Sequence, residues 1–396
     1  MNSDLQTMGW VAAALVTAMV VALIATPVVK SLAFKVGAVD VPKDNRRMHD
    51  HPIPRMGGLA IFFGFILSVL LYVEMTPQLR GMLLGGVIIV VLGIFDDIYA
   101  LGAKFKLAIQ IVAALVAVLS GNVIQILSNP NVLSPNPWWD LGWLSYPATV
   151  LWIVAITNAV NLIDGLDGLA CGVSTISALT MLVISLAVAD APVAIVMAAL
   201  AGGCIGFLPY NLNPAKIFMG DTGSTFLGFI LAVMSIQGLF KFYTIISFAV
   251  PFLMLGLPLF DTCFAIFRRL SKGQSPMAPD RSHVHHRLID MGFNQKQAVA
   301  ILYLVSAILG LSAVVLTTSG ALKAMVLLCA LCLAGLIASK IFLVHNRESL
   351  PAPADPSQTT KEADHHAAES DDHLRHPPGG SENGAPGQGA GEQGGD

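Results

Sequence analysis

Four polar residues stand at intervals of three in the stretch NAVNLIDGLDGLA, residues 158–170: Asn158, Asn161, Asp164 and Asp167. They occur in a chain that is 55% hydrophobic and only 12% charged. If a helix continues through the stretch, this spacing places the four side chains near one face. The two Asp-Gly pairs are equally compatible with a loop of two turns. The interpretation we favour is that the four side chains face a hydrated pocket that holds a metal ion.

Asp96 and Asp97 stand side by side in FDDIYALGAKFK, where another apolar segment ends. Two adjacent carboxylates repel each other, so keeping both ionised calls for a cation. A hard divalent metal such as Mg²⁺ would serve, although a solvated pair that ends a helix at the membrane interface fits the same residues. Lys106, nine residues after Asp97, can neutralise a phosphate or pair with the aspartates; a lysine there is also a common anchor at a cytoplasmic helix end.

A third polar cluster, MGDTGST, precedes a further apolar segment. Gly220 and Gly223 leave room for a ligand to approach the backbone beside Asp221. Thr222 or Ser224 can cap the following helix, whose N-terminus would attract phosphate. Asp221 serving only as a helix cap is the alternative. The sequence contains no GxxxxGK[ST] motif, so ATP-driven chemistry is not supported.

The fourth cluster, PDRSHVHHRL (279–288), combines histidine and arginine. Neutral or cationic histidine beside arginine suits the binding of phosphate or sugar hydroxyls, and a merely hydrated loop is the alternative. Its candidate ligands are Arg281, His283, His285 and His286. Asp261 lies inside an apolar segment and is either a functional carboxylate or a partner for neighbouring helix ends.

Membrane helices must position these clusters. The mean hydropathy is +0.71, and apolar runs long enough to cross a bilayer recur along the chain. The sequence therefore predicts an all-α, polytopic membrane helix bundle. About eleven spans are expected, at residues 8–30, 57–74, 81–95, 107–121, 145–160, 170–189, 191–208, 224–238, 242–267, 297–318 and 321–345. The ninth contains Pro251, Gly256 and Pro258, so we expect it to be kinked or broken.

Lysine and arginine predict the orientation. With the N-terminus outside and the C-terminus inside, nineteen of the 22 basic residues fall on the inner side and three outside. All four polar clusters then lie at the cytoplasmic face, which suggests one shared site. Residues 1–347 form the predicted membrane domain. Residues 348–396, rich in Gly, Pro and acids, are predicted to be a disordered cytoplasmic tail. The net charge of −3 argues against a nucleic-acid partner.

Five blocks of this sequence together resemble those of one known family. They are PRMGGLAIF (54–62), GIFDDIYALGAKFKLAIQ (93–110), NAVNLIDGLDGLA (158–170), KIFMGDTGSTFLGF (216–229) and PDRSHVHHRL (279–288). In this order they resemble the cytoplasmic blocks of the polyprenyl-phosphate N-acetylhexosamine-1-phosphate transferases. The resemblance covers about residues 8–345 and leaves the tail outside.

The resemblance implies transfer of a sugar-1-phosphate from a UDP-sugar to a lipid phosphate, with release of UMP. It implies Mg²⁺, sometimes replaced by Mn²⁺, as cofactor, and a homodimer is common in the family. Asp221 would be the main metal ligand, with Asn161 close to the metal and the diphosphate. Asp96 and Asp97 would be catalytic or hold the lipid phosphate, and Lys106 would contact phosphate. Asp164 and Asp167 would line the nucleotide site, and the loop with Arg281, His283, His285 and His286 would close on the sugar nucleotide. As cations, Lys106 and His283 would be catalytic by offsetting the repulsion between the two phosphate substrates.

The His-Val-His-His run narrows the resemblance. It is similar to the branch that uses UDP-GlcNAc and undecaprenyl phosphate in the bacterial inner membrane and starts O-antigen, enterobacterial common antigen or teichoic acid linkage units. The enzyme that uses UDP-MurNAc-pentapeptide typically carries three consecutive histidines instead. A secondary transporter and a docking scaffold are rivals from other classes. Transporter sites lie near the bilayer midplane, often on inverted repeats, which are not evident here.

Overall fold

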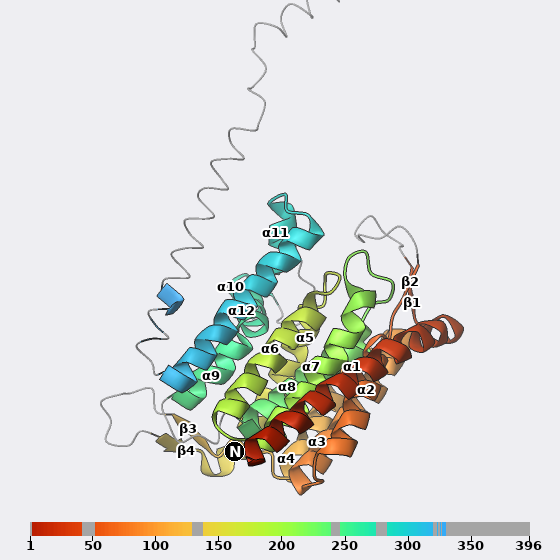
Figure 1. Ribbon diagram of the computed structural model, residues 1–396. Helices are drawn as coiled ribbons and strands as arrows, with labels where there is room; N and C mark the ends of the chain where they lie inside the picture. Colours follow the sequence, from red (N-terminus) through yellow and green to blue (C-terminus); the bar gives the residue numbers. More distant parts are fainter. Residues whose placement is uncertain are drawn as a thin grey trace, which may run out of the picture. The chain divides into compact units, whose positions relative to one another are not determined.

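The computed structural model describes residues 2–41, 52–128, 138–238, 246–274 and 283–319, with a few positions between 323 and 329. These residues belong to one compact unit, Met1–Cys332, and are almost entirely helical (Figure 1). The predicted tail, 348–396, lies outside the described residues.

Twelve α-helices are present in the described part of the chain. They are α1 (Asn2–Val36), α2 (Gly58–Tyr72), α3 (Pro77–Tyr99), α4 (Ala103–Leu119), α5 (Ser145–Leu162), α6 (Leu169–Ala187), α7 (Ala191–Asn211), α8 (Gly220–Gly238), α9 (Ile246–Met254), α10 (Gly256–Ser271), α11 (Val284–Asp290) and α12 (Gln295–Ser319). A short 3₁₀ turn, Gly142–Leu144, leads into α5.

Helices occupy most of each of the first ten predicted spans, although residues 242–245 of the ninth lie outside the described residues. The ninth span is divided between α9 and α10 at Leu255, as expected from its Pro and Gly residues. Six described helices, α1, α3, α5, α6, α7 and α12, are long and apolar enough to cross a membrane, and α2 is a shorter apolar helix. The chain is therefore a multi-pass membrane protein. The last predicted span, 321–345, lies almost wholly outside the described residues.

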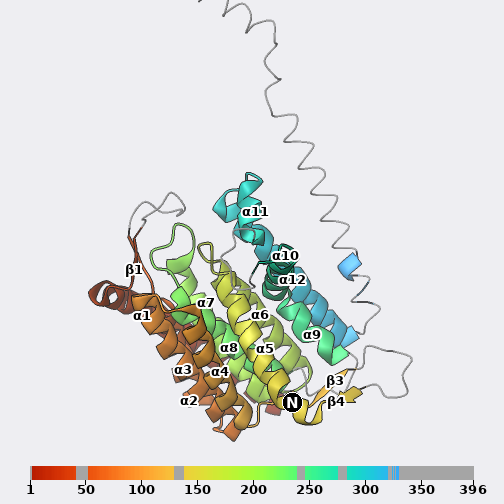
Figure 2. The same cartoon turned by 180° about the vertical axis from the view of Figure 1, so that it is seen from behind.

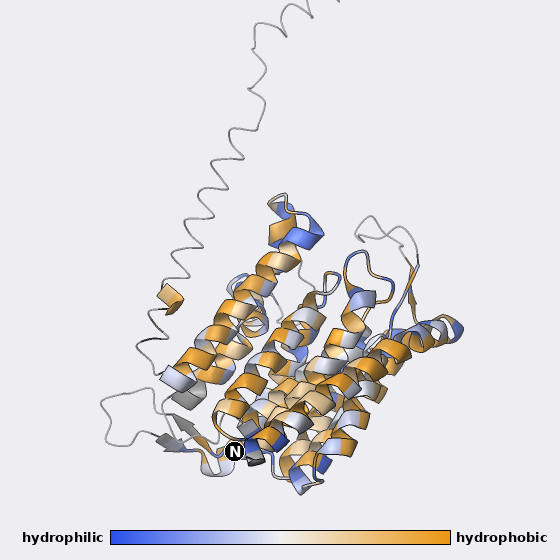
Figure 3. Cartoon of the chain, in the orientation of Figure 1, coloured by the Kyte–Doolittle hydropathy of each residue, from blue (hydrophilic) through white to orange (hydrophobic). Residues whose placement is uncertain are grey.

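Apolar side chains cover the outside of the bundle as well as its interior. Leu70, Leu71 and Leu151, for example, are each more than half exposed. Figure 3 shows hydrophobic colouring along the middle of the helices and hydrophilic colouring at α11 and other helix ends. This is the distribution expected where lipid, and not water, surrounds the middle of the bundle.

Two short antiparallel hairpins correct the expectation of a purely helical chain. β1 (Val39–Asp40) pairs with β2 (Ile53–Pro54), and β3 (Ile126–Ser128) pairs with β4 (Trp138–Asp140). In Figures 1 and 2 the β1–β2 hairpin and α11 lie at one end of the bundle, and the N-terminus of α1 lies with the β3–β4 hairpin at the other.

Helix α8 is the core element that organises the polar end of the bundle. Every residue of α8 is buried except Asp221 and Gln237, which are partly exposed. Glycine permits the close approach of its neighbours: a Cβ at Gly58 would collide with the backbone of Gly223, and one at Gly93 would collide with that of Thr222. The first turn of α8 is therefore held tightly against α2 and α3.

Candidate active site

Asp97 caps helix α8 from the neighbouring helix α3. Its carboxylate accepts hydrogen bonds from the backbone N–H groups of Asp221 (2.9 Å) and Thr222 (3.1 Å) and from the Thr222 hydroxyl (2.7 Å). Gly220, the first residue of α8, has a φ of 73°, and a Cβ there would meet the Asp97 carboxylate. The expectation that Thr222 or Ser224 caps α8 was wrong, because a buried carboxylate from α3 takes those N–H groups. They are consequently not free to bind phosphate.

Asp96 contacts a different set of partners from Asp97. One of its oxygens accepts a hydrogen bond from the N–H of Leu101 (2.7 Å), and the other accepts one from the Lys106 ammonium (2.8 Å). Lys106 also donates to Asp221 Oδ2 at 2.8 Å. The two neighbouring carboxylates are thus stabilised separately by the protein itself, Asp96 through Lys106 and Asp97 through the start of α8.

Arg55 is a site residue that the sequence analysis did not single out. Its Nε lies 3.5 Å from Asp97 Oδ1, and its Nη2 lies 4.0 Å from Asp221 Oδ1. The β1–β2 hairpin positions it, since Pro54 C=O accepts a hydrogen bond from the N–H of Phe218 just before α8. The signal that could have revealed it is the single cation in the block PRMGGLAIF.

The stretch 158–170 is a helix end followed by a loop, as in the second interpretation of its sequence. Helix α5 ends at Leu162, and α6 begins at Leu169. Asn158 donates to Gln110 of α4 at 2.7 Å, whereas Asn161 donates to Ser224 in the first turn of α8 at 2.8 Å. The idea that all four side chains face one pocket was therefore wrong for Asn158, which joins two helices.

Asp167 and Asp164 have different surroundings within this loop. Asp167 accepts hydrogen bonds from Asn213 Nδ2 (2.9 Å) and from the N–H of Ala215 (3.1 Å), so it holds the loop between α7 and α8. Asp164 is partly buried, and burial together with the nearby Asp221 carboxylate raises its pKa to about 8. Such a carboxylate favours a cation or a proton beside it.

The histidine cluster is anchored by Asp261 of α10. His283 Nδ1 lies 2.8 Å from Asp261 Oδ2, and the other oxygen, Oδ1, accepts a hydrogen bond from the N–H of Val284 at 2.9 Å. Both ring and carboxylate are buried. Asp261 therefore caps α11 and orients the His283 ring, as expected of a partner for a neighbouring helix end, whereas a functional role for this carboxylate stays a prediction.

His285 connects the histidine cluster to the loop that contains Asp164. A Cβ at Gly165 would collide with His285 Nε2, so the imidazole packs directly on this glycine. Its ring centroid lies 4.3 Å from that of His286. Burial and the neighbouring His286 lower the pKa of His285 to about 4, which keeps the ring neutral. Arg281, the remaining predicted residue, lies outside the described residues.

The oxygen donors at the start of α8 fit a hard cation. Within the described ranges no three His, Cys, Asp or Glu side chains form a ready-made metal site. Mg²⁺ is nevertheless commonly held by one or two carboxylates, with substrate phosphates completing its shell. The Asp221 carboxylate is one such oxygen donor. The amide oxygen of Asn161 is another, because the amide nitrogen of the same side chain donates its hydrogen bond to the Ser224 hydroxyl. The predicted ligand pair is thus chemically suitable.

Comparison with known proteins points to the same family as the five sequence blocks. The family model for Glycosyl transferase family 4 matches residues 79–239, from α3 through the end of α8. A probable undecaprenyl-phosphate N-acetylglucosaminyl 1-phosphate transferase of Bacillus subtilis is 45% identical, over 77% of this chain and 85% of its own length.

Two further relatives have related names. The decaprenyl-phosphate N-acetylglucosaminephosphotransferase of Mycolicibacterium smegmatis is 36% identical, over 73% of this chain and 77% of its own. The undecaprenyl-phosphate alpha-N-acetylglucosaminyl 1-phosphate transferase of Yersinia pestis is 30% identical, over 73% and 79%. The resemblance drawn from the sequence is confirmed. The chain is a transferase of the membrane and belongs to Glycosyl transferase family 4.

Proposed function

We propose that this chain transfers GlcNAc-1-phosphate from UDP-GlcNAc to undecaprenyl phosphate, giving undecaprenyl-diphosphate-GlcNAc and UMP. The names of the relatives support this donor and this acceptor. The observation that carries the proposal is the position of Lys106, which donates to both Asp96 and Asp221 where α3, α4 and the buried helix α8 meet. A cation shared by two carboxylates at the end of apolar helices suits two phosphate substrates, one of which is anchored in lipid.

The reaction is a direct in-line displacement. An oxygen of the lipid phosphate forms a bond to the sugar-linked phosphorus of the donor. The bond from that phosphorus to the bridging oxygen breaks, and its electron pair leaves with UMP. Nucleophile and target are both anionic, so the site must offset their repulsion and the charge that develops on UMP.

Basic side chains of this chain lower that repulsion. Lys106 and Arg55 place two cations beside the Asp221 carboxylate. Asp96 accepts the acceptor's proton when the lipid phosphate arrives as the monoanion. The Asp97 carboxylate already accepts hydrogen bonds from the start of α8 and pairs with Arg55, so its role is to position Asp221. Mg²⁺, or Mn²⁺ in its place, held by Asp221 and Asn161, would supply further charge neutralisation for the diphosphate.

The histidine cluster recognises the donor. Asp261 fixes His283 through Nδ1, so Nε2 is the nitrogen that can meet the sugar nucleotide. Arg281, His285 and His286 belong to the same donor-binding loop. Asp164 lines the part of the site that binds the nucleotide. Asp167 contributes by holding the loop between α7 and α8 in place.

The reaction takes place at the cytoplasmic face of the bacterial inner membrane. The excess of Lys and Arg in the segments predicted to be internal supports that orientation, with the N-terminus outside and the C-terminus inside. The lipid-linked product would begin a cell-envelope polysaccharide, such as O-antigen or a teichoic acid linkage unit. Assembly into a homodimer remains a prediction from the family resemblance.

A donor panel tests this function. The purified full-length protein is incubated with undecaprenyl phosphate, Mg²⁺ and UDP-GlcNAc, UDP-GalNAc or UDP-MurNAc-pentapeptide, and UMP is measured. We expect UMP with UDP-GlcNAc, equal in amount to the lipid-linked sugar, and none without the lipid. Preferential use of UDP-MurNAc-pentapeptide would assign the chain to peptidoglycan synthesis instead.

A further inference from the structure

Helix α12 contacts the loop between α5 and α6, residues 163–168, which we call the Asp164 loop. The Tyr303 hydroxyl of α12 donates to the carbonyl oxygen of Gly168 at 2.6 Å. The same oxygen accepts a hydrogen bond from the N–H of Gly172 at 2.9 Å, in the first turn of α6. One oxygen atom at the end of the Asp164 loop therefore connects α6 to α12.

Glycine residues allow Tyr303 to reach this position. A Cβ at Gly172 would collide with the Tyr303 ring, so the ring lies directly on α6. Gly168 has a φ of 77°, a backbone conformation that favours glycine. Further along the same two helices, a Cβ at Gly310 of α12 would collide with Thr180 of α6. The hydrogen bond is therefore part of a closely packed helix pair.

The start of α12 makes a second, indirect contact with the Asp164 loop. Gln295, the first residue of α12, accepts a hydrogen bond from Asn213 Nδ2 at 2.7 Å. Asn213 Nδ2 also donates to the Asp167 carboxylate at 2.9 Å. Gln295 and Tyr303 lie roughly 12 Å apart along the helix axis. Helix α12 thus holds the Asp164 loop at two separate points.

A third contact to the Asp164 loop comes from the histidine cluster. Gly165 lies so close to the His285 imidazole that a Cβ would collide with it. His285 belongs to α11, which precedes α12 in the chain, and a hydrogen bond from the N–H of Phe293 to the carbonyl of Leu288 (3.2 Å) joins the two helices (Figure 1). The loop is consequently held by two neighbouring helices.

We propose that α12 positions the Asp164 loop for the sugar-nucleotide donor through Tyr303 and Gln295; this rests on the proposed function. A loop that is already ordered does not have to be ordered when the donor binds, so the donor avoids that entropic cost. Tyr303 is a positioning residue, because its hydroxyl bonds to Gly168 and acts on the donor only through the loop.

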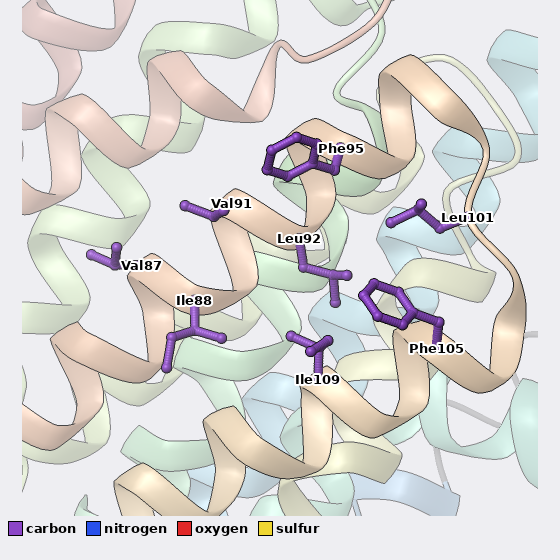
Figure 4. A pocket seen from close by; sticks show the side chains of 8 residues that line it. All are labelled: Val87, Ile88, Val91, Leu92, Phe95, Leu101, Phe105 and Ile109. Atoms are coloured by element: carbon purple, nitrogen blue, oxygen red, sulfur yellow. The ribbon is translucent and has the colours of Figure 1, made fainter.

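The part of the site around Lys106 is separate from these contacts. Phe95 and Phe105, the chain neighbours of Asp96 and Lys106, line the apolar groove between α3 and α4 that Figure 4 shows. Tyr303 is not among the residues that line this groove. Loosening the Asp164 loop should therefore weaken donor binding and leave the KM for undecaprenyl phosphate unchanged.

Tyr303→Phe removes only the hydroxyl, and Ser306→Ala is the matched control. Ser306 is buried on the same helix, and its hydroxyl has no hydrogen-bond partner among the described residues. UDP-GlcNAc binding to the full-length protein is measured by isothermal titration calorimetry with Mg²⁺ and without lipid. We expect the Kd to rise roughly fivefold in Tyr303→Phe, the effect of one lost hydrogen bond, and to stay at the wild-type value in Ser306→Ala. Equal Kd values in the two variants would overturn the proposal.

Turnover separates a positioning role from a general loss of structure. In UMP release by Tyr303→Phe, the KM for UDP-GlcNAc should rise, while kcat and the KM for the lipid stay within about twofold of wild type. A structural defect would instead lower the amount of active enzyme and therefore the apparent kcat. A fall in kcat with an unchanged KM for UDP-GlcNAc would contradict the positioning role.

Gln295→Ala covers the case in which Tyr303→Phe fails to fold, because Gln295 is partly exposed at the start of α12. Its control is Gln297→Ala, since Gln297 bonds to Asn294 within its own turn. We expect faster amide hydrogen exchange in residues 163–168 and a roughly two- to fivefold higher Kd for UDP-GlcNAc in Gln295→Ala alone. Unchanged exchange in residues 163–168 would show that α12 does not hold the loop.

The two proposals fail in different ways. If the wild type releases no UMP from UDP-GlcNAc, the proposed donor is wrong, whereas faster exchange of the Asp164 loop in the variants would still support its attachment to α12. If the wild type releases UMP but Tyr303→Phe binds UDP-GlcNAc as tightly as Ser306→Ala does, the transferase assignment stands and the positioning role is wrong.

Discussion

The Lys106 ammonium lies 2.8 Å from Asp221 Oδ2, although the two residues are 115 positions apart in the sequence. Lys106 stands in the first turn of α4, and Asp221 stands in the first turn of α8. The contact brings the starts of two helices together at one point. Because the same ammonium donates to Asp96, its removal leaves two partly buried carboxylates without their shared cation.

Replacing Lys106 by glutamine should lower kcat by roughly 100-fold or more, since a preorganised charge next to the reacting phosphates is lost. Lys104→Gln is the control, because Lys104 is exposed on the same helix and outside the cluster. UMP release is measured for both purified variants. Undiminished turnover by Lys106→Gln would remove Lys106 from the mechanism.

Thr222→Val tests the capping of α8 by Asp97. The buried Thr222 hydroxyl donates to that carboxylate at 2.7 Å, so its loss should reduce the free energy of unfolding by about 1–3 kcal/mol. Thr225→Val should cost less, because the Thr225 hydroxyl bonds only to the carbonyl of Asp221 in its own helix. Tm values in detergent compare the two. A larger loss in Thr225→Val would contradict the assigned role of Asp97.

Asp261→Asn tests whether Asp261 acts through His283. We expect a fall in kcat of about 100-fold, because the His283 imidazole beside the donor phosphates loses the carboxylate that orients it. The double variant with His283→Ala should be no slower than His283→Ala alone, because the two residues form one unit. Asp290→Asn, at the exposed end of α11, is the control. Independent, multiplicative losses in kcat would show that Asp261 does not act through His283.

Asp164 should make stability depend on pH. Its pKa is raised to about 8, so the folded protein binds this proton more tightly than the unfolded chain does. The resulting stabilisation is complete below about pH 4 and is lost as the pH rises through 8. In EDTA, the Tm of wild type should fall more between roughly pH 5 and pH 8.5 than that of Asp164→Asn. If the Tm of both proteins changed with pH in parallel, the pKa of Asp164 would not be raised in the folded protein.

Much of the helical framework is predictable from hydropathy, because a bilayer allows few backbone structures except the helix. The broken ninth span followed from Pro251 and Gly256. The gathering of polar clusters at one end followed from the placement of Lys and Arg in alternate loops.

The pairings inside the site were not predictable. That Asp97 caps α8, while the adjacent Asp96 bonds Lys106, depends on which way each side chain leaves α3. That choice is set by close contacts such as Gly93 against Thr222, more than a hundred residues apart. Arg55 was missed for the same reason, since only the β1–β2 hairpin brings it to Asp97.

Asp221→Asn tests the central claim most directly. The purified variant, with wild-type Tm, is given UDP-GlcNAc, undecaprenyl phosphate and Mg²⁺, and UMP release is followed. A loss of roughly 1,000-fold or more is expected, because this carboxylate holds both the proposed metal and Lys106. Turnover close to that of wild type would contradict a phosphate-transfer site at the start of α8.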